Sequence, residues 1–448
     1  MMTAIHLKHH SKQPIHVLIF DTENTLGCGV AYSTYTDLHL LNVAAGNMSA
    51  FPDDPEHFIN WAQQNYPERF TETENSINSF LPRSLFGKYL QEIASTLTIN
   101  SDPNFDFEFI SQKVTAITKI TSGFKICTST DGDFTADAVV LATGNFLPAK
   151  PKGIPGDFTN SNRYFGNPWS ELSVANASGI KKILIVGTGL TMVDVVQGLR
   201  IKGYEGKITA LSPKGFEILP HHQQNVKIDL QGEITVPYQL DKIFKLFKKR
   251  VRELKSNGLH SDAVVDAIRP LTQKIWSSIS VDERKQFLSH LRHLWGLARH
   301  RLPGQIHRQL LDQMEQGMLQ IIAGRIIDIN DEGTFAKVTY RERKTGQINE
   351  ITVERVINCT GPAMDVTKTN NALFDSMIVS GMVFPEELKM GIKVDQDFHV
   401  LKSTGQPQMN MYALGSLLKG MLWESTAVPE LRIQAKQVAK TILRDLNS

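Results

Sequence analysis

Three apolar segments of the chain end at glycine residues, and this pattern predicts buried parallel strands. They are Val139–Gly144, which ends in Thr-Gly, Val356–Pro362, which repeats that ending, and Ile183–Gly189. Because apolar side chains occupy consecutive positions, both faces of each strand are expected to be covered by helices. The chain is therefore predicted to have an α/β fold with parallel sheets.

The two Thr-Gly strands share a preceding pattern, which we interpret as an internal repeat. Polar and apolar residues alternate there in short segments, as they do in an antiparallel meander. The segments are Lys113–Ile120 and Phe124–Thr130, with a turn at Asp131-Gly132, and in the second copy Gly324–Asn330, Ala336–Arg341 and Ile351–Val356. The repeat predicts two related, three-layer, Rossmann-like nucleotide-binding domains. A chance recurrence of strand-rich sequence is the alternative.

Between His221 and Glu315 the pattern becomes helical. Tyr238–Lys255 and Val281–His300 carry apolar residues at helical spacing, opposite charged faces. We interpret this stretch, at about 222–315, as a helical insertion in the second domain. The basic, amphipathic segment Lys242–Lys255 is expected to be a solvated outer face. A site for a membrane surface or an acidic partner is the less favoured alternative.

The clearest chemical motif is the turn Gly187-Thr188-Gly189-Leu190-Thr191. It follows a predicted strand, opens a helix at Leu190–Arg200 and leads to a second strand at Lys207–Leu211. This is the context of a dinucleotide fingerprint, in which glycines let a pyrophosphate approach the amide groups of a helix N-terminus. Met192 stands where the third glycine is usual, so helix and strand are expected to pack further apart. A tight βα turn without a ligand is the alternative.

The residues after the second strand indicate which nicotinamide nucleotide is used. NAD sites place a carboxylate there to bind the ribose 2′-hydroxyl. Here the strand ends in Leu211-Ser212-Pro213-Lys214. Since Ser212 and Lys214 favour a 2′-phosphate, NADP is the expected ligand.

The N-terminal residues are predicted to form the second half of a βαβ unit. Met1–His10 is the end of a helix, and Ile15–Asp21 is an apolar strand that ends in an acid placed to bind ribose hydroxyls. The strand and glycine turn that normally precede such a helix are missing. Neighbouring strands are then expected to have unpaired edges. Either the chain starts at an internal methionine of a longer protein, or it is a degenerate product.

Several longer motifs resemble those of the bacterial FAD/NAD(P)-binding protein family. They extend over nearly the whole chain and are Gly27–Ser33, Leu41–Pro52, Pro82–Leu90, Gly187–Asp194, Tyr412–Gly415 and Trp423–Arg432. The family is similar to flavin monooxygenases and to glutathione-reductase-like flavoproteins with two dinucleotide-binding domains. The resemblance implies that fold, FAD and NAD(P)H as cofactors, and an oxidoreductase activity.

The resemblance also implies cofactor contacts. Asp21 matches the family's ribose-binding acid, whereas the glycines that would hold the FAD pyrophosphate are absent. Arg83 is expected to contact an FAD phosphate, and a surface salt bridge is the alternative. Trp423 is expected to contact the flavin or the substrate, and a place in the core is the alternative. The remaining expected contacts are Gly29, Asn42, Met48, Ser49, Thr143, Gly144, Gly361, Gly415, Ser416 and Val428.

The C-terminal segment supports a flavin site. Met411–Leu414 is a short strand entering Gly415-Ser416, and Val428 opens a helix with Pro429 in its first turn. The N-terminus of that helix would stabilise negative charge on a reduced flavin. Related flavoproteins usually have Asp where Ser416 stands, so a weaker hydrogen bond is expected. An ordinary strand–loop–helix is the alternative.

These patterns predict three chain segments in two domains. Residues 1–165 form the first part of an FAD-binding domain, and residues 166–323 form the NAD(P)-binding domain with its insertion. Residues 324–448 form the remaining meander and the return part of the FAD-binding domain.

Composition excludes several other classes of protein. The formal charge of the 448 residues is +2, with 21% charged residues, which gives no general attraction to nucleic acid. No apolar run approaches the roughly 20 residues of a membrane span. Cys28, Cys127 and Cys359 form no C-x-x-C pair, and His221-His222 lacks recognisable further metal ligands. A cytoplasmic protein without a metal centre is expected, and its oligomeric state is left open.

The predicted chemistry is hydride transfer from NAD(P)H to flavin, with NADPH favoured. This step needs alignment rather than an acid–base residue, and no catalytic side chain is identified. The final acceptor is oxygen, as in a monooxygenase, or another small molecule. Arg163–Trp169 resembles the linker motif of flavin monooxygenases only weakly, because its histidine is missing. The alternatives are a non-catalytic NADP-binding module and an inactive truncated product that has lost FAD binding.

Overall fold

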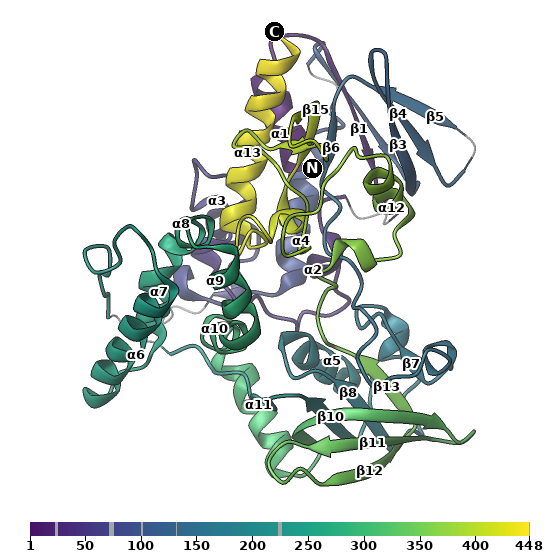
Figure 1. Ribbon diagram of the computed structural model, residues 1–448, viewed down its shortest axis with the longest axis vertical. Helices are drawn as coiled ribbons and strands as arrows, with labels where there is room; N and C mark the ends of the chain where they lie inside the picture. The colour runs from purple at the N-terminus through teal and green to yellow at the C-terminus, as the bar shows by residue number, and fades with distance from the viewer. Residues whose placement is uncertain (23–25, 71–75, 100–101, 131, 223–225, 448) are drawn as a thin grey trace. The chain divides into compact units, whose positions relative to one another are not determined.

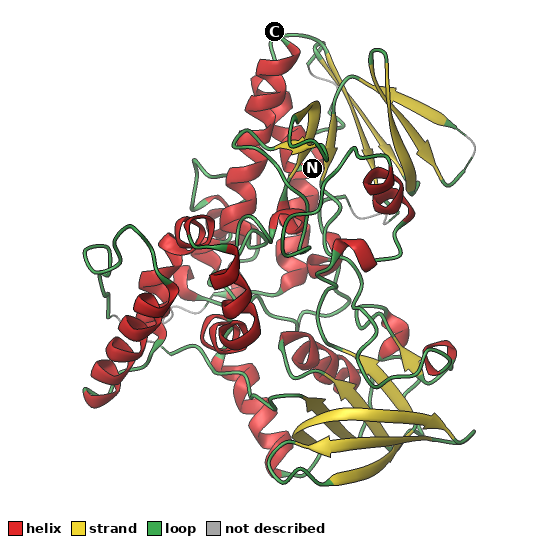
Figure 2. Cartoon of the chain, viewed as in Figure 1, coloured by secondary structure: helices red, strands yellow, loops and turns green. Residues whose placement is uncertain are grey.

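The computed structural model describes residues 1–22, 26–70, 76–99, 102–130, 132–222 and 226–447. Asp131 of the predicted meander turn lies outside these residues. Helices and strands alternate along the chain (Figure 2), so the predicted α/β class is confirmed. The chain forms two compact units. Unit 1 contains Met1–Asn145, Thr272–Ser277 and Met364–Ser448, and unit 2 contains Phe146–Leu271 and Ser278–Ala363.

Unit 1 contains three separate sheets (Figure 1). Strand β1 pairs in parallel with β2, and β6 pairs in parallel with β15, which is antiparallel to β14. A third sheet is the meander β3-β4-β5. The bounds are β1 Ile15–Phe20, β2 Phe105–Ile110, β3 Val114–Ile120, β4 Gly123–Thr128, β5 Asp133–Ala136, β6 Val139–Leu141, β14 His399–Leu401 and β15 Pro407–Ala413. Within the described ranges, β1 and β6 are end strands of their sheets.

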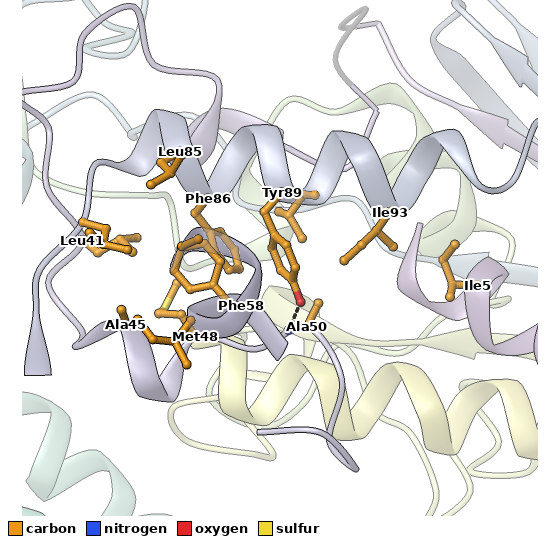
Figure 3. Packing of buried hydrophobic residues seen from close by; sticks show 14 of the residues in the cluster. Ile5, Leu41, Ala45, Met48, Ala50, Phe58, Leu85, Phe86, Tyr89 and Ile93 are labelled. Atoms are coloured by element: carbon orange, nitrogen blue, oxygen red, sulfur yellow. Dashed lines mark hydrogen bonds between the residues drawn. The ribbon is translucent and has the colours of Figure 1, made fainter. Parts of the chain in front are cut away.

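Unit 1 contains seven of the described α-helices, and α1, α3 and α4 among them bury an aromatic core. The seven are α1 Met2–His10, α2 Gly29–Tyr32, α3 His57–Asn65, α4 Arg83–Ser95, α8 Thr272–Ser278 (its first six residues), α12 Ala372–Val379 and α13 Val428–Leu446. Figure 3 shows Phe58, Phe86 and Tyr89 packed together, and all three are at most 1% exposed. The Tyr89 hydroxyl accepts a hydrogen bond from the Ala50 amide at 3.3 Å. This bond and the apolar contacts fix the segment 41–51 against α4.

Unit 2 is built on one seven-stranded sheet with the order β12-β11-β10-β9-β8-β13-β7. The bounds are β7 Tyr164–Phe165, β8 Lys182–Val186, β9 Lys207–Ser212, β10 Leu319–Asp331, β11 Ala336–Glu342, β12 Ile348–Val353 and β13 Arg355–Asn358. Its helices are α5 Leu190–Ile201, α6 Leu240–Ser256, α7 Asp262–Ile268, α9 Val281–Gln286, α10 Arg292–Arg299 and α11 Gly304–Glu315. Ile183, Leu184 and Ile185 are fully buried, as their uninterrupted apolar run predicts.

Both predicted meanders are present, but they join their parallel strands differently. The first is a sheet of its own, whereas β10 pairs in parallel with β9 and then in antiparallel with β11. Strand β10 therefore starts at Leu319, five residues before the predicted start, because Leu319–Ala323 form the parallel pairing.

Two predicted elements are interrupted. The strand expected over Ile351–Val356 breaks at Glu354, where the chain leaves β11 and joins β8. The Glu354 carboxylate accepts hydrogen bonds from the Lys181 and Lys182 amides at 3.0 and 2.7 Å, which holds this break in place. The helix expected over Val281–His300 contains a π-helical segment, Phe287–Leu291, between α9 and α10.

Candidate cofactor-binding sites

The turn after β8 is shaped by the close approach of two strands. Gly187 has φ +115°, and its amide donates to the Leu211 carbonyl at 2.8 Å. A Cβ at this position would lie 2.4 Å from the Cys359 carbonyl oxygen, so only glycine fits between β8 and β13. Gly187 is therefore required by the packing of the sheet, whether or not a ligand is bound.

Gly189 has a different environment. It is the N-cap of α5, with φ −88°, and no atom lies within 4 Å of where its Cβ would be. No side chain caps the helix, and its first turn holds no acidic residue. The Met192 and Val193 amides donate to the Gly189 carbonyl, so the Leu190 and Thr191 amides are the donors that this uncapped helix start can offer to a pyrophosphate. Thr188, Leu190 and Thr191 complete this turn.

Met192 is 1% exposed and belongs to the core of unit 2. The apolar side chain thus occupies the space in which the usual third glycine brings helix and strand together. Asp194, two residues further along α5, is also buried at 6% exposure.

The carboxyl ends of β8, β9 and β13 meet at one edge of the sheet, because these strands are parallel and adjacent. The Ser212 hydroxyl lies 3.0 Å from that of Thr188 and accepts a hydrogen bond from the Gly215 amide, also at 3.0 Å. Gly361, after β13, has φ +87° and open space at its Cβ position. The predicted contacts of unit 2 are therefore gathered where α/β sheets bind nucleotides.

Lys214, which the sequence predicted, and Arg292, which it did not, both act on one histidine, His293. Burial lowers the pKa of His293, and the nearby charges of Arg292 and Lys214 lower it further. Arg292 is the first residue of α10, in the helical insertion. Lys214 is exposed. No local motif links residues about 80 positions apart, so only the fold could bring them together.

In unit 1, the two glycine turns after the parallel strands β6 and β15 are in contact. The Ser416 hydroxyl donates a hydrogen bond to the Gly144 carbonyl. Gly144, which follows Thr143, has φ +69° and no atom within 4 Å of its Cβ position. The Gly415 amide donates to the Gln434 side chain at 2.9 Å, and the Ser425 hydroxyl donates to the Gly415 carbonyl at 2.8 Å. These bonds tie both turns to α13.

The other residues predicted to contact FAD have varied surroundings. Asp21 follows β1, and its amide donates to the Ile110 carbonyl at 3.2 Å. Gly29, the first residue of α2, has open space at its Cβ position, and Arg83 donates from Nε to the Leu40 carbonyl at 3.0 Å. Asn42 is half-buried in the loop between them.

Met48 and Ser49 face the core of unit 1. Met48 is 3% exposed, and the fully buried Ser49 hydroxyl donates to the Asp54 carbonyl at 2.5 Å. The structure therefore gives both side chains a packing role, and their contact with FAD stays a prediction.

Trp423 and Val428 lie on the loop and helix after Ser416. The Trp423 ring stacks on Trp276 of α8 with centroids 4.8 Å apart, and Trp276 donates from Nε1 to the Gly420 carbonyl at 2.8 Å. Val428 is the first residue of α13, whose N-cap, Ala427, has no side-chain hydrogen bond to offer. Pro429 has no N–H, and the Glu430 and Leu431 amides donate to the Ala427 carbonyl at 3.1 and 2.9 Å, so the Val428 amide is the donor that the start of α13 can offer to a ligand.

A cavity of about 580 Å³ in unit 1 lies elsewhere. Its lining includes Ser11, Ile15, Lys119 and Asn447. Ile15 begins β1, whereas Asp21 follows the end of that strand. Since nucleotides bind at the carboxyl ends of parallel strands, we do not assign this cavity to a cofactor.

Other chemistries find little support in the described part of the chain. The structure shows no arrangement there of three or more His, Cys, Asp or Glu side chains that could hold a metal ion. His222 instead pairs with Asp262 at 3.2 Å and stacks on His260. No described helix is long and apolar enough to span a membrane. The lysines on the outer face of α6 are exposed to solvent.

The thiols are separate and unactivated. Cys28, Cys127 and Cys359 are all free, and burial raises the pKa of Cys28 and of Cys359. For Cys127, a hydrogen bond to Asp133 is the main reason that the pKa is raised. A protonated thiol is a poor nucleophile, so none of the three resembles a redox-active cysteine.

Comparison with known proteins agrees with this geometry. Residues 1–146 match the family model described as FAD-NAD(P)-binding. No match is found among curated proteins. Among solved structures, the ornithine N-hydroxylase KtzI of Kutzneria sp. 744 is similar with a TM-score of 0.68 and 14% identity, over 100% of this chain and 96% of its own.

Two further structures show the range of the likeness. The cadaverine monooxygenase DfoA of Erwinia amylovora has a TM-score of 0.65 and 10% identity, over 98% of this chain and 91% of its own. The thioredoxin reductase of T. acidophilum has a TM-score of 0.52 and 13% identity, over 100% and 95%. The predicted flavoprotein fold with two dinucleotide-binding domains is thereby confirmed.

The fold and the family match together define the class of this protein. Residues 1–146 match the FAD-NAD(P)-binding family model, and the whole chain has the fold of flavoproteins with two dinucleotide-binding domains. The match does not favour the alternative of a non-catalytic NADP-binding module.

Proposed function

We propose that the chain is an NADPH-dependent flavin monooxygenase that hydroxylates the nitrogen of a small primary amine. In the balanced reaction, the amine, O2, NADPH and a proton give the hydroxylamine, water and NADP+. One oxygen atom enters the new N–O bond, the other leaves as water, and NADPH supplies the electron pair.

The observation that carries this proposal is the likeness of the whole fold to amine hydroxylases. Similar structures include those named as ornithine hydroxylase of Pseudomonas aeruginosa and L-lysine 6-monooxygenase of Pseudomonas syringae, besides KtzI and DfoA. Their TM-scores range from 0.62 to 0.68, whereas the disulfide and thioredoxin reductases score 0.51 to 0.54. The separate, protonated thiols of this chain also argue against electron transfer through its own cysteines.

In this proposal each unit holds one cofactor. The open amides at Gly189–Thr191 would bind the NADPH pyrophosphate, while Ser212, Lys214 and Arg292 would contact the 2′-phosphate. In unit 1, Asp21, Gly144 and Ser416 would contact FAD, and the Val428 amide at the start of α13 would offer it a further donor. FAD, when bound, accepts hydride from NADPH and passes the electrons to oxygen.

The residues of unit 1 fit a nucleotide in three respects. No atom lies within 4 Å of where a Cβ of Gly29 or of Gly144 would be, and the N-terminus of α13 has no side-chain cap. The two glycines remove steric obstruction, and the Val428 amide is left as a donor for an anionic oxygen.

The proposal is tested with purified protein supplied with FAD and NADPH. Ornithine, lysine and cadaverine are each added, and the N-hydroxylated product is measured by mass spectrometry. We expect product from at least one amine, in proportion to NADPH consumed. If NADPH is oxidised but every amine is recovered unchanged, the N-hydroxylase proposal is wrong, and a reductase of another small acceptor remains.

A further inference from the structure

Lys419 lies between the two glycine turns of unit 1. It directly follows the 3₁₀ turn Gly415–Leu418, and its ammonium group is 3.3 Å from the Asn145 side-chain oxygen. Asn145 follows Gly144, and Ser416 donates its hydroxyl hydrogen to the Gly144 carbonyl. The lysine is thus held at the contact between the strands β6 and β15.

The surroundings of this ammonium group are unfavourable for a charge. The side chain is half-buried between the fully buried Leu418 and the buried Gly420. Burial lowers the pKa of Lys419. Asn145 offers only a neutral oxygen, and none of the carboxylates in the described residues forms an ion pair with this lysine. An anion that approaches a half-buried cation of this kind stabilises its charged form.

The neighbouring space can accept such an anion. Gly144 has no atom within 4 Å of its Cβ position, so the backbone beside the ammonium is open. An ammonium group has three N–H donors, of which Asn145 uses one. The other two are available to a ligand lying against Gly144.

We propose that Lys419 is the counter-ion of the bound flavin nucleotide in unit 1. This inference rests on the proposed function, since it requires that the unit binds FAD. Its ligand is an anionic group of FAD, which is either the pyrophosphate or the N1–C2=O region of the reduced ring. Lys419 is a positioning and electrostatic residue, and nothing in the reaction requires it to transfer a proton.

The reduced ring and the pyrophosphate, as the two possible partners of Lys419, should give different results when the lysine is replaced. Lys419→Met keeps the apolar stem but removes the charge. If Lys419 faces the ring, reduced FAD should bind about tenfold more weakly relative to oxidised FAD, which lowers the midpoint potential by about 30 mV. If it faces the pyrophosphate, both forms should bind about tenfold more weakly and the potential should not change.

Two further variants separate charge from structure. Lys419→Arg should restore most of the affinity or potential, because it keeps the positive charge. Lys440→Met removes an exposed lysine from α13 and should behave as wild type. The inference is overturned if Lys419→Met matches Lys440→Met in both affinity and potential.

A measurement on the unmodified chain covers the case in which Lys419→Met does not fold. Lysines are reductively methylated with and without FAD, and the rates at Lys419 and Lys440 are compared by mass spectrometry. FAD should slow methylation at Lys419 at least tenfold and leave Lys440 unchanged. Equal rates with bound FAD would overturn the inference alone, whereas a wild-type chain that binds no FAD would overturn the proposed function as well.

Discussion

At the scale of single residues, the two glycines of the turn after β8 have different roles, although both belong to one Gly-x-Gly motif. Gly187 is needed because the Cys359 carbonyl lies 2.4 Å from where its Cβ would be. Gly189 is surrounded by open space and has a backbone conformation that alanine can adopt. The sequence located the turn, but it could not separate the glycine required by the sheet from the one available to a ligand.

Substitution of the two glycines should therefore give opposite results. Gly189→Ala should leave the stability nearly unchanged and weaken NADPH binding about tenfold, because the new methyl group enters the space meant for the pyrophosphate. Gly187→Ala should lower the free energy of unfolding by about 3 kcal/mol, through strain and overpacking. Chemical denaturation and NADPH titration measure both effects. Unchanged NADPH affinity in folded Gly189→Ala would contradict the assigned site.

Lys214 and Arg292, the two cations that act on His293, should select NADPH over NADH in the proposed site. Lys214→Ala and Arg292→Ala should each raise the KM for NADPH about five- to tenfold, since each removes a charge from the 2′-phosphate site, and should leave the KM for NADH unaltered. Lys207→Ala, at the opposite end of β9, is the matched control. Equal losses with both nucleotides would place these cations outside the 2′-phosphate site.

At the scale of elements, a buried histidine joins β14, β15 and α13. His399 is 4% exposed, and its ring nitrogens lie 2.9 Å from Asp395 and 2.6 Å from Asp445. The Asp445 carboxylate also accepts the Tyr412 hydroxyl at 2.7 Å. Burial lowers the pKa of His399, but the two carboxylates outweigh it, and the net pKa is raised.

This network should make stability depend on pH. A raised pKa means that the contribution of His399 is fully present below about pH 6.5 and is lost as the pH rises through the folded-state value. His399→Gln should remove this decline and cost about 3 kcal/mol, because two carboxylates lose their buried partner. Melting temperatures of both proteins across the neutral and mildly alkaline range measure the difference.

The histidines with lowered pKa do not obscure this test. Burial lowers the pKa of His6 to about 4, and it also lowers the pKa of His293. These two histidines reduce stability only as the pH falls below the ordinary pKa of histidine. Their effect therefore lies on the acidic side, and that of His399 on the alkaline side. If the two melting curves run parallel above neutral pH, the assignment of the charge to His399 is wrong.

Helices and strands were predicted well where a local sequence pattern determines them. They were predicted poorly where pairing with another strand determines where an element ends. The runs at Ile183–Val186 and Val139–Leu141 became strands as predicted, because uninterrupted apolar sequence has few other solutions. The break at Glu354 was missed, because it arises from the exchange of one partner strand for another. The alternation of polar and apolar residues does not reveal which strand will be the partner.

At the scale of the whole molecule, the repeat of meander and Thr-Gly strand was enough to predict two nucleotide-binding domains. The contacts between distant segments were not predictable. Arg292 and Lys214 act on the same histidine, His293, although they are far apart in the sequence, and Lys419 meets Asn145 because β15 pairs with β6. The sequence therefore indicated the class of cofactor, whereas the charges expected to tune each site came from the fold.

The absence of a cysteine mechanism can be tested on the whole chain. Replacement of Cys28, Cys127 and Cys359 by alanine should preserve NADPH-dependent flavin reduction within about twofold, since no described thiol is activated. The two buried positions should cost about 1 kcal/mol each through lost packing. Loss of flavin reduction in a folded triple variant would indicate a thiol-dependent reductase instead.

The central claim is that one chain brings FAD and NADPH together for hydride transfer. It is tested most directly by mixing FAD-loaded protein with NADPH in the absence of oxygen and following the visible absorption of the flavin. The account predicts that the yellow colour bleaches faster with NADPH than with NADH and returns when oxygen is admitted. Protein that remains colourless in excess FAD, or bound flavin that NADPH does not bleach, would contradict it.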